Sequence, residues 1–117
     1  MRRLVLGYVA FLTLSSLYAE TDQSRVVREI RDLRRGEIAT IRGQVVRYPD
    51  YDELVLQDRS GRIEVYLGER SASEPVARVG ETILVHGRAD DDGLFRPREI
   101  YAFEITREDG STTRLEN

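Results

Sequence analysis

The chain has 117 residues, of which 18 are basic and 21 acidic, and a formal net charge of -3. All of its basic residues are arginine, and it contains one histidine and no cysteine. This composition excludes disulfides, thiolate metal sites and lysine-dependent Schiff-base chemistry. The length is that of one domain, and the residue types favour a binding module over an enzyme.

The first residues have the order of a secretory signal peptide. Met1–Arg3 is basic, Leu4–Leu14 is mostly apolar, and small residues precede Ala19. The apolar stretch is shorter than the roughly 20 residues that a membrane-spanning helix needs. We therefore predict cleavage after Ala19 and a periplasmic mature chain with 16 arginines and 21 acids. Because Leu17 is unusual three residues before the cut, an uncleaved anchor is the alternative.

The segment after the leader has helical spacing. Apolar residues at 26, 27, 30 and 33 fall on one side of a helix, Ser24 can cap its start, and Gly36 ends the pattern. The sequence predicts a short amphipathic helix here.

The period then changes to the two-residue alternation of strands. Five strands are expected, at residues 37–47, 53–58, 62–67, 82–89 and 95–106. Residues 71–80 are expected to hold a helical turn, since Pro75 suits a first turn and Gly80 can terminate it. The predicted boundaries are a signal peptide at 1–19, a folded domain at 20–107 and a polar, frayed tail at 108–117.

Two glycines interrupt these strands and point to a particular barrel. Gly43 and Gly87 lie inside the first and fourth strands, where a glycine marks a bulge or a sharp bend. Five strands with a long link between the third and fourth follow the order of an OB-fold, a five-stranded Greek-key barrel. We predict an all-β OB-fold with a short N-terminal helix. An SH3-like barrel is the alternative.

Four sequence runs also resemble a known family: Leu33–Glu37, Ile41–Val46, Leu54–Val65 and Val79–Gly87. The chain is similar to the bacterial OB-fold (BOF) proteins, small periplasmic proteins of the stress-tolerance type, over residues 26–106 and in its leader. The resemblance implies a binding protein without catalytic residues and without a cofactor. The chain departs from the family in lacking lysine and in having few aromatic residues in its middle strands.

The candidate site follows from where OB-folds bind, which is the outer face of the second and third strands and the flanking loops. Alternation places polar and aromatic side chains on that face. We expect it to bind a small cationic or neutral ligand or an envelope protein, with no stable insertion into a membrane after cleavage. The expected ligand-binding residues are Tyr51, Gln57, Arg62, Glu64 and Tyr66.

Two other functions compete with this prediction. One is a module for single-stranded nucleic acid, because the element Asp58–Ile63 also occurs in OB domains that bind DNA or tRNA. The acidic net charge disfavours it, since binding to phosphates relies on positive charge. The other is an envelope assembly protein that pairs a partner strand with an exposed sheet edge.

Two further features are expected to be structural. Asp90–Asp92 lacks the spacing of a calcium loop, so we predict a solvated turn before Gly93 and no metal site. His86 has no partners for a zinc site, and we predict a structural or surface role for it. No spacing pairs a nucleophile with a base, so we predict no enzymatic activity.

Overall fold

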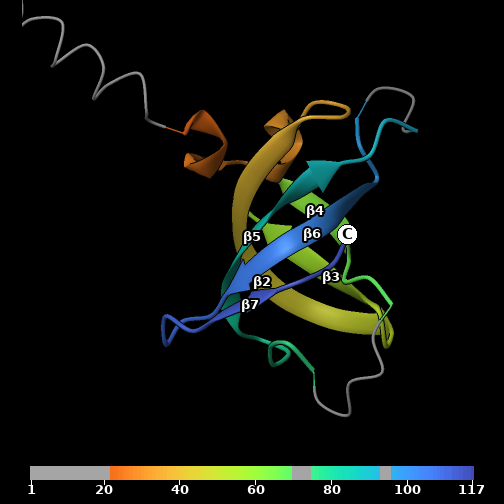
Figure 1. The fold of residues 1–117 in the computed structure, drawn as a ribbon. Coiled ribbons are helices and arrows are strands. Elements are labelled where there is room, and N and C mark those ends of the chain that lie inside the picture. The colour runs from red at the N-terminus through yellow and green to blue at the C-terminus, as the bar shows by residue number, and fades with distance from the viewer. Residues whose placement is uncertain (1–21, 70–74, 93–95) are drawn as a thin grey trace, which may run out of the picture.

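The computed structural model describes residues 22–69, 75–92 and 96–117, and these form a barrel of β-strands (Figure 1). The barrel strands are β2 (Ile38–Asp50), β3 (Glu53–Asp58), β4 (Gly61–Tyr66), β5 (Thr82–Ala89) and β6 (Glu99–Thr106). Two short strands and two 3-10 turns complete the described elements: β1 (Val27–Arg28), β7 (Thr112–Arg114), η1 (Gln23–Arg25) and η2 (Ile30–Asp32). The five predicted strands are confirmed, although β2 runs to Asp50 instead of ending at residue 47, and β6 begins at Glu99, so that residues 96–98 of the predicted last strand are not part of it.

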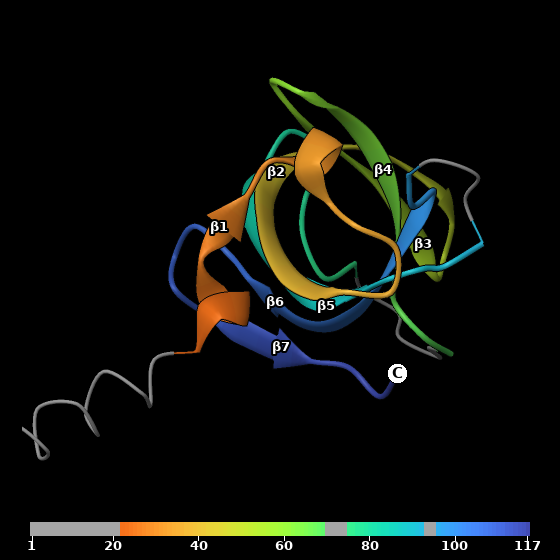
Figure 2. The same cartoon turned by 90° about the horizontal axis from the view of Figure 1, so that it is seen from above.

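The long strand β2 closes the barrel because it pairs on both sides. Its first half runs antiparallel to β5, from Ile38 opposite Arg88 to Gln44 opposite Thr82. Its second half runs antiparallel to β3. The strand β6 then pairs antiparallel with β5 and parallel with β4. Viewed from above, β2 curves around the barrel (Figure 2), which is the closure that the OB-fold prediction requires.

The two glycines predicted to mark bends do lie at close approaches of the backbone. A Cβ atom on Gly43 would lie 2.7 Å from the carbonyl oxygen of Gln57, because β2 passes from β5 to β3 here. A Cβ atom on Gly87 would collide with the carbonyl oxygen of Tyr101. The β5–β6 register shifts between His86 and Gly87, so the predicted irregularity is present.

The core fills the inside of the barrel with alternate aliphatic side chains. On β4, Ile63 and Val65 are buried while Arg62 and Glu64 are exposed, as the alternation predicts. The fully buried side chains with the largest volumes are Ile41, Leu54, Leu56, Leu67, Ile83, Ile100, Ile105, Val45, Val65 and Val85.

The predicted N-terminal helix is wrong. Residues 23–32 form η1, the two-residue strand β1 and η2, and β1 pairs parallel with β2. Ile30 is buried, but Val26 and Val27 are 52% and 43% exposed. Adjacent β-branched residues favour an extended backbone, and the backbone N–H of Ile30 donates to Asp58 Oδ2 at 2.8 Å. Tertiary contacts therefore hold the segment flat against the barrel.

The C-terminal residues also differ from the expectation of a frayed tail. Within them β7 pairs antiparallel with β6, and Leu115 packs against the core. The backbone N–H of Leu115 donates to the carbonyl of Phe103 at 2.8 Å. The strand β7 is too short for its alternation to be recognised in the sequence. Its pairing with β6 holds this part of the C-terminal segment in place.

The remaining predicted segments lie partly outside the described residues. The leader 1–19 is outside them, as are residues 71–74 of the expected helical turn, Gly93 of the expected acidic turn and residue 95, where the last strand is expected to begin. Residues 75–80 contain no helix, and Val76 and Ala77 join the core instead. Among the described residues, no helix has the length and apolarity to cross a membrane.

Candidate binding groove

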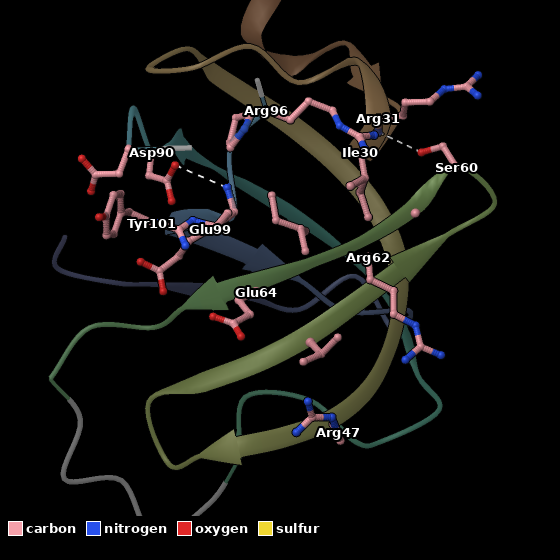
Figure 3. A pocket seen from close by; sticks show the side chains of 16 residues that line it. Ile30, Arg31, Arg47, Ser60, Arg62, Glu64, Asp90, Arg96, Glu99 and Tyr101 are labelled. Atoms are coloured by element: carbon pink, nitrogen blue, oxygen red, sulfur yellow. Dashed lines mark hydrogen bonds between the residues drawn. The ribbon is translucent and has the colours of Figure 1, made fainter. Parts of the chain in front are cut away.

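A groove of about 950 Å³ opens beside β3 and β4, between η2 and the segment that leads into β6 (Figure 3). We call it the β3–β4 groove. Val55, which is buried, is one of its apolar lining residues. Its charged and aromatic lining residues are Arg31, Arg47, Arg62, Glu64, Asp90, Asp92, Arg96, Arg98, Glu99 and Tyr101.

The barrel topology brings these side chains together from distant parts of the chain. Alternation on β4 presents Arg62 and Glu64 on the outer face. The parallel pairing of β4 with β6 places Glu99 opposite Glu64. Arg47 comes from the second half of β2, and Arg31 comes from η2. The groove is therefore assembled from every barrel strand except β5, together with the N-terminal segment.

The arginines of the groove have no ionic partner in the part of the chain that the structure describes. We call Arg31, Arg47, Arg62, Arg96 and Arg98 the groove arginines; all five are exposed. Across the described residues none of their side chains forms an ion pair, and their one side-chain hydrogen bond runs from Arg62 Nε to Gln57 Oε1 at 2.6 Å. Several arginines elsewhere are paired with carboxylates: Arg25 with Glu104, Arg28 with Glu37, Arg59 with Glu29, and Arg107 with Glu81.

Two carboxylates that line the groove, Glu64 and Glu99, lie close to a third one, Glu53, which is not a lining residue. Glu53, Glu64 and Glu99, which we call the carboxylate cluster, bring oxygen atoms within 4.8 Å of one another. Burial, followed by the charges of Glu64 and Asp52, raises the pKa of Glu53. Burial, followed by the charges of Glu53 and Asp90, raises the pKa of Glu99. Carboxylates of this kind can hold a hard divalent cation, although exposed acidic groups also gather without one.

Tyr101 borders the carboxylate side of the groove. Its ring meets the ring of Tyr66 edge-on, with centroids 6.0 Å apart. The guanidinium carbon of Arg88 lies 5.6 Å from the centroid of Tyr101. Both contacts engage the aromatic surface within the protein itself.

The structure brings together some of the predicted site residues and separates others. Arg62 and Glu64 line the groove, and Gln57 lies beside it as the hydrogen-bond partner of Arg62. Tyr66 is not a lining residue, but its ring contacts the ring of Tyr101, which lines the groove. Tyr51 lies in the turn between β2 and β3, is 64% exposed and is not a lining residue.

Sequence reasoning missed four of the groove arginines. Arg96 and Arg98 flank Pro97 just before β6, and this repeated arginine was an available signal. Arg31 and Arg47 had no such signal, because they reach the groove only through the placement of η2 and the curvature of β2.

The acidic turn and the histidine have structural roles. Asp90 is only 7% exposed, so the expectation of a solvated turn is wrong at this residue. Its Oδ1 accepts the backbone N–H of Arg98 at 3.4 Å, which joins the two ends of the β5–β6 connection. His86 Nδ1 lies 2.9 Å from Thr40 Oγ1, and its ring meets that of Phe103 edge-on, outside the groove.

Comparisons with known proteins agree on the fold. No protein-family model matches the chain, and a search of curated proteins gave no significant match. Telomere capping protein Ten1 from Saccharomyces pombe is similar in structure, with a TM-score of 0.57 and 19% identity over 74% of this chain and 84% of that one. The Stn1–Ten1 complex of the same organism matches with a TM-score of 0.55 and 18% identity, over 79% of this chain and 82% of the other.

A bacterial structure is similar at higher sequence identity. The hypothetical protein YgiW from E. coli matches with a TM-score of 0.55 and 27% identity, over 72% of this chain and 89% of that one. Together with the closed five-stranded barrel, these likenesses define the chain as an OB-fold protein.

Proposed function

We propose that the chain is an exported, non-enzymatic OB-fold binding protein of the periplasmic stress-tolerance type, which holds a small ligand or a protein partner in the β3–β4 groove. The observation that carries the proposal is the groove itself, because it lies on the strands with which OB-folds bind. The groove arginines support it, since their hydrogen-bond donors have no ionic partner within the described residues.

Export is supported by the leader and by the bacterial likeness. The basic start, apolar stretch and Ala19 have the order of a cleavable signal. YgiW, the prototype of the BOF proteins, is also the neighbour with the highest identity among those given above.

A binding role without catalysis fits the residues at hand. The chain has neither cysteine nor lysine, and its one histidine lies outside the groove in contact with Thr40 and Phe103. The groove presents guanidinium groups and carboxylates, which recognise charged and hydroxylated ligands by hydrogen bonds.

Single-stranded nucleic acid is the second candidate, and the groove arginines favour it because phosphates are recognised by basic grooves. Strand-edge pairing has less support. The edge strands of the described sheet, β1 and β7, are two and three residues long, and short edges resist the addition of a partner strand.

Two measurements test the proposal. The full-length chain is expressed, cells are fractionated, and the N-terminus is read by mass spectrometry. We expect a periplasmic protein that begins at Glu20, and an intact Met1 in the cytoplasm would overturn export. The mature chain is then titrated by NMR with sugar phosphates, spermine and an acidic peptide. At least one probe should move the amide signals of Arg62 and Glu64, and a groove that responds to none of them would refute binding there.

A further inference from the structure

We propose that the β3–β4 groove binds a small sugar or polyol that carries more than one phosphate group. This inference rests on the proposed function and names the ligand class for the same groove. It differs from the cationic or neutral ligand expected from the sequence.

The guanidinium groups of the groove arginines form no ion pairs among the described residues. The chain is acidic overall, and four of its described arginines form ion pairs with carboxylates: Arg25, Arg28, Arg59 and Arg107. Of the described arginines that form none, five lie together in the groove. The groove arginines remain without such pairs among the described residues, even though Glu64 and Glu99 line the same groove. A guanidinium offers a planar fork of donors that matches phosphate oxygens, so these groups are suited to an anion from outside the chain.

The placement of the groove arginines indicates a ligand with more than one anionic group. Figure 3 shows Arg31 and Arg96 at one end of the groove, Arg47 at the opposite end and Arg62 between them. A single phosphate at one end could not contact the arginine at the other. Because the groove has a volume of about 950 Å³, it has room for a ligand that spans these positions.

The carboxylate side of the groove suits hydroxyl groups. Glu64 and Glu99 lie across the groove from Arg62 in Figure 3, with Tyr101 beside them. Carboxylate oxygens accept hydrogen bonds, and the hydroxyl groups of a sugar or polyol donate them. A ligand with phosphates at one side and hydroxyls at the other would therefore satisfy both sets of residues.

A nucleic-acid strand fits the groove less well. Bases need aromatic side chains on which to stack, and Tyr101 is the one aromatic residue among the described residues that line the groove. Its ring already contacts Tyr66 and Arg88. The acidic net charge would also repel a long polyanion beyond the groove.

The test measures binding of inositol 1,4,5-trisphosphate, which carries three phosphates and three free hydroxyl groups, to the mature chain by calorimetry. Arg62→Gln and Arg47→Gln each remove one exposed groove guanidinium, and we expect each to weaken binding about tenfold. Arg59→Gln is the matched control, because it makes the same change of charge at an exposed arginine paired with Glu29 outside the groove. It should change the affinity by less than about twofold.

Several results would overturn the inference. These are no binding at low salt, an equal loss in all three variants, or tighter binding of tripolyphosphate, which has no polyol hydroxyls. A 12-residue thymidine oligonucleotide that binds more tightly would shift the assignment to nucleic acid. If only spermine moves the groove signals, the ligand class is wrong while the proposed function stands; if no probe moves them, both fail.

A second arm distinguishes a soluble ligand from a lipid headgroup of the same chemistry. Vesicles of phosphatidylcholine with phosphatidylinositol 4,5-bisphosphate present two ring phosphates and hydroxyls at a surface. Sedimentation of the protein with these vesicles, reduced by Arg62→Gln and not by Arg59→Gln, would support a lipid source. Binding of the soluble probe without sedimentation would support a soluble source.

Discussion

Gly87 occupies a position in β5 that leaves no room for a side chain. The backbone of β6 passes so close that a Cβ atom would meet the carbonyl oxygen and carbon of Tyr101. The neighbouring strands cannot separate there without opening the barrel, because β5 also pairs with β2. A Cβ atom at position 87 would therefore interfere with the closure of the barrel.

The substitution Gly87→Ala should therefore destabilise the protein by about 3 kcal/mol, as overpacking against a backbone does. Urea unfolding followed by circular dichroism measures the change. Gly61→Ala is the control, since a Cβ atom there would meet nothing nearer than Ile30 at 4.0 Å. A loss of similar size at both glycines would contradict this account of the barrel.

The carboxylate cluster is a second feature at this scale. Burial and like charge raise the pKa of Glu53 and Glu99 above the ordinary glutamate value of 4.5. The folded chain therefore holds these protons more strongly than the unfolded chain. The stabilisation is complete below pH 4.5 and is lost as the pH rises through the raised values.

The substitution Glu99→Gln removes one charge from the cluster and should raise the free energy of unfolding at pH 7 by up to about 1 kcal/mol. The gain should vanish near pH 4, where the carboxyl group is already protonated. Unfolding in urea at both pH values measures it, with Glu116→Gln as an exposed control. An equal effect at the two pH values would show that repulsion between the carboxylates of the cluster does not destabilise the folded protein.

At the scale of elements, Asp58 connects the β3–β4 hairpin with the N-terminal segment. Its Oδ1 accepts the backbone N–H of Ser60 at 2.7 Å and that of Gly61 at 3.1 Å, and its Oδ2 accepts that of Ile30. Burial alone would raise the pKa of Asp58, but the hydrogen bonds from Ser60, Ile30 and Gly61 outweigh it and lower the value. The stabilisation is thus present above pH 3.8 and is lost as the pH falls through the lowered pKa.

Asp58→Ala should lower the free energy of unfolding by about 2 kcal/mol, since it leaves several backbone donors unpaired. It should also release η2, which would appear as faster hydrogen exchange at Ile30. The control is Asp109→Ala, where one exposed turn loses its hydrogen bonds from Ser111. Unchanged exchange at Ile30 would refute the connecting role of Asp58.

The strands were predictable from sequence, whereas the N-terminal segment was not. The alternation of polar and apolar residues at Arg62, Ile63 and Glu64 indicates which side chains face the core and which face solvent, and it can be read from the local sequence. The helical spacing of apolar residues at 26–33 did not predict the structure of this segment. Its contacts with Asp58 and its pairing with β2 override the local preference for a helix. The groove could be predicted only in part, since the pairing of β4 with β6 joins residues far apart in the chain.

At the scale of the whole molecule, the structure sorts its charges. Four arginines outside the groove form ion pairs with carboxylates, as Arg107 does with Glu81 at 2.7 Å, and none of the five groove arginines does so among the described residues. The groove arginines keep their donors beside four lining carboxylates, so a protein of net charge -3 presents a surface with groups that can bind an anion. Such a surface attracts a small anion while the acidic remainder keeps long polyanions away. Ligand binding should accordingly weaken with salt, since exposed charges are screened.

The central claim is that the groove arginines bind the ligand and the paired arginines do not. The decisive experiment follows the Nε–Hε signals of the arginine side chains by NMR while inositol 1,4,5-trisphosphate is added to the mature chain. The signals of Arg31, Arg47 and Arg62 should move and saturate together. Those of Arg25, Arg59 and Arg107 should stay in place. Movement of all arginine signals in parallel, or of the paired arginines alone, would contradict the claim.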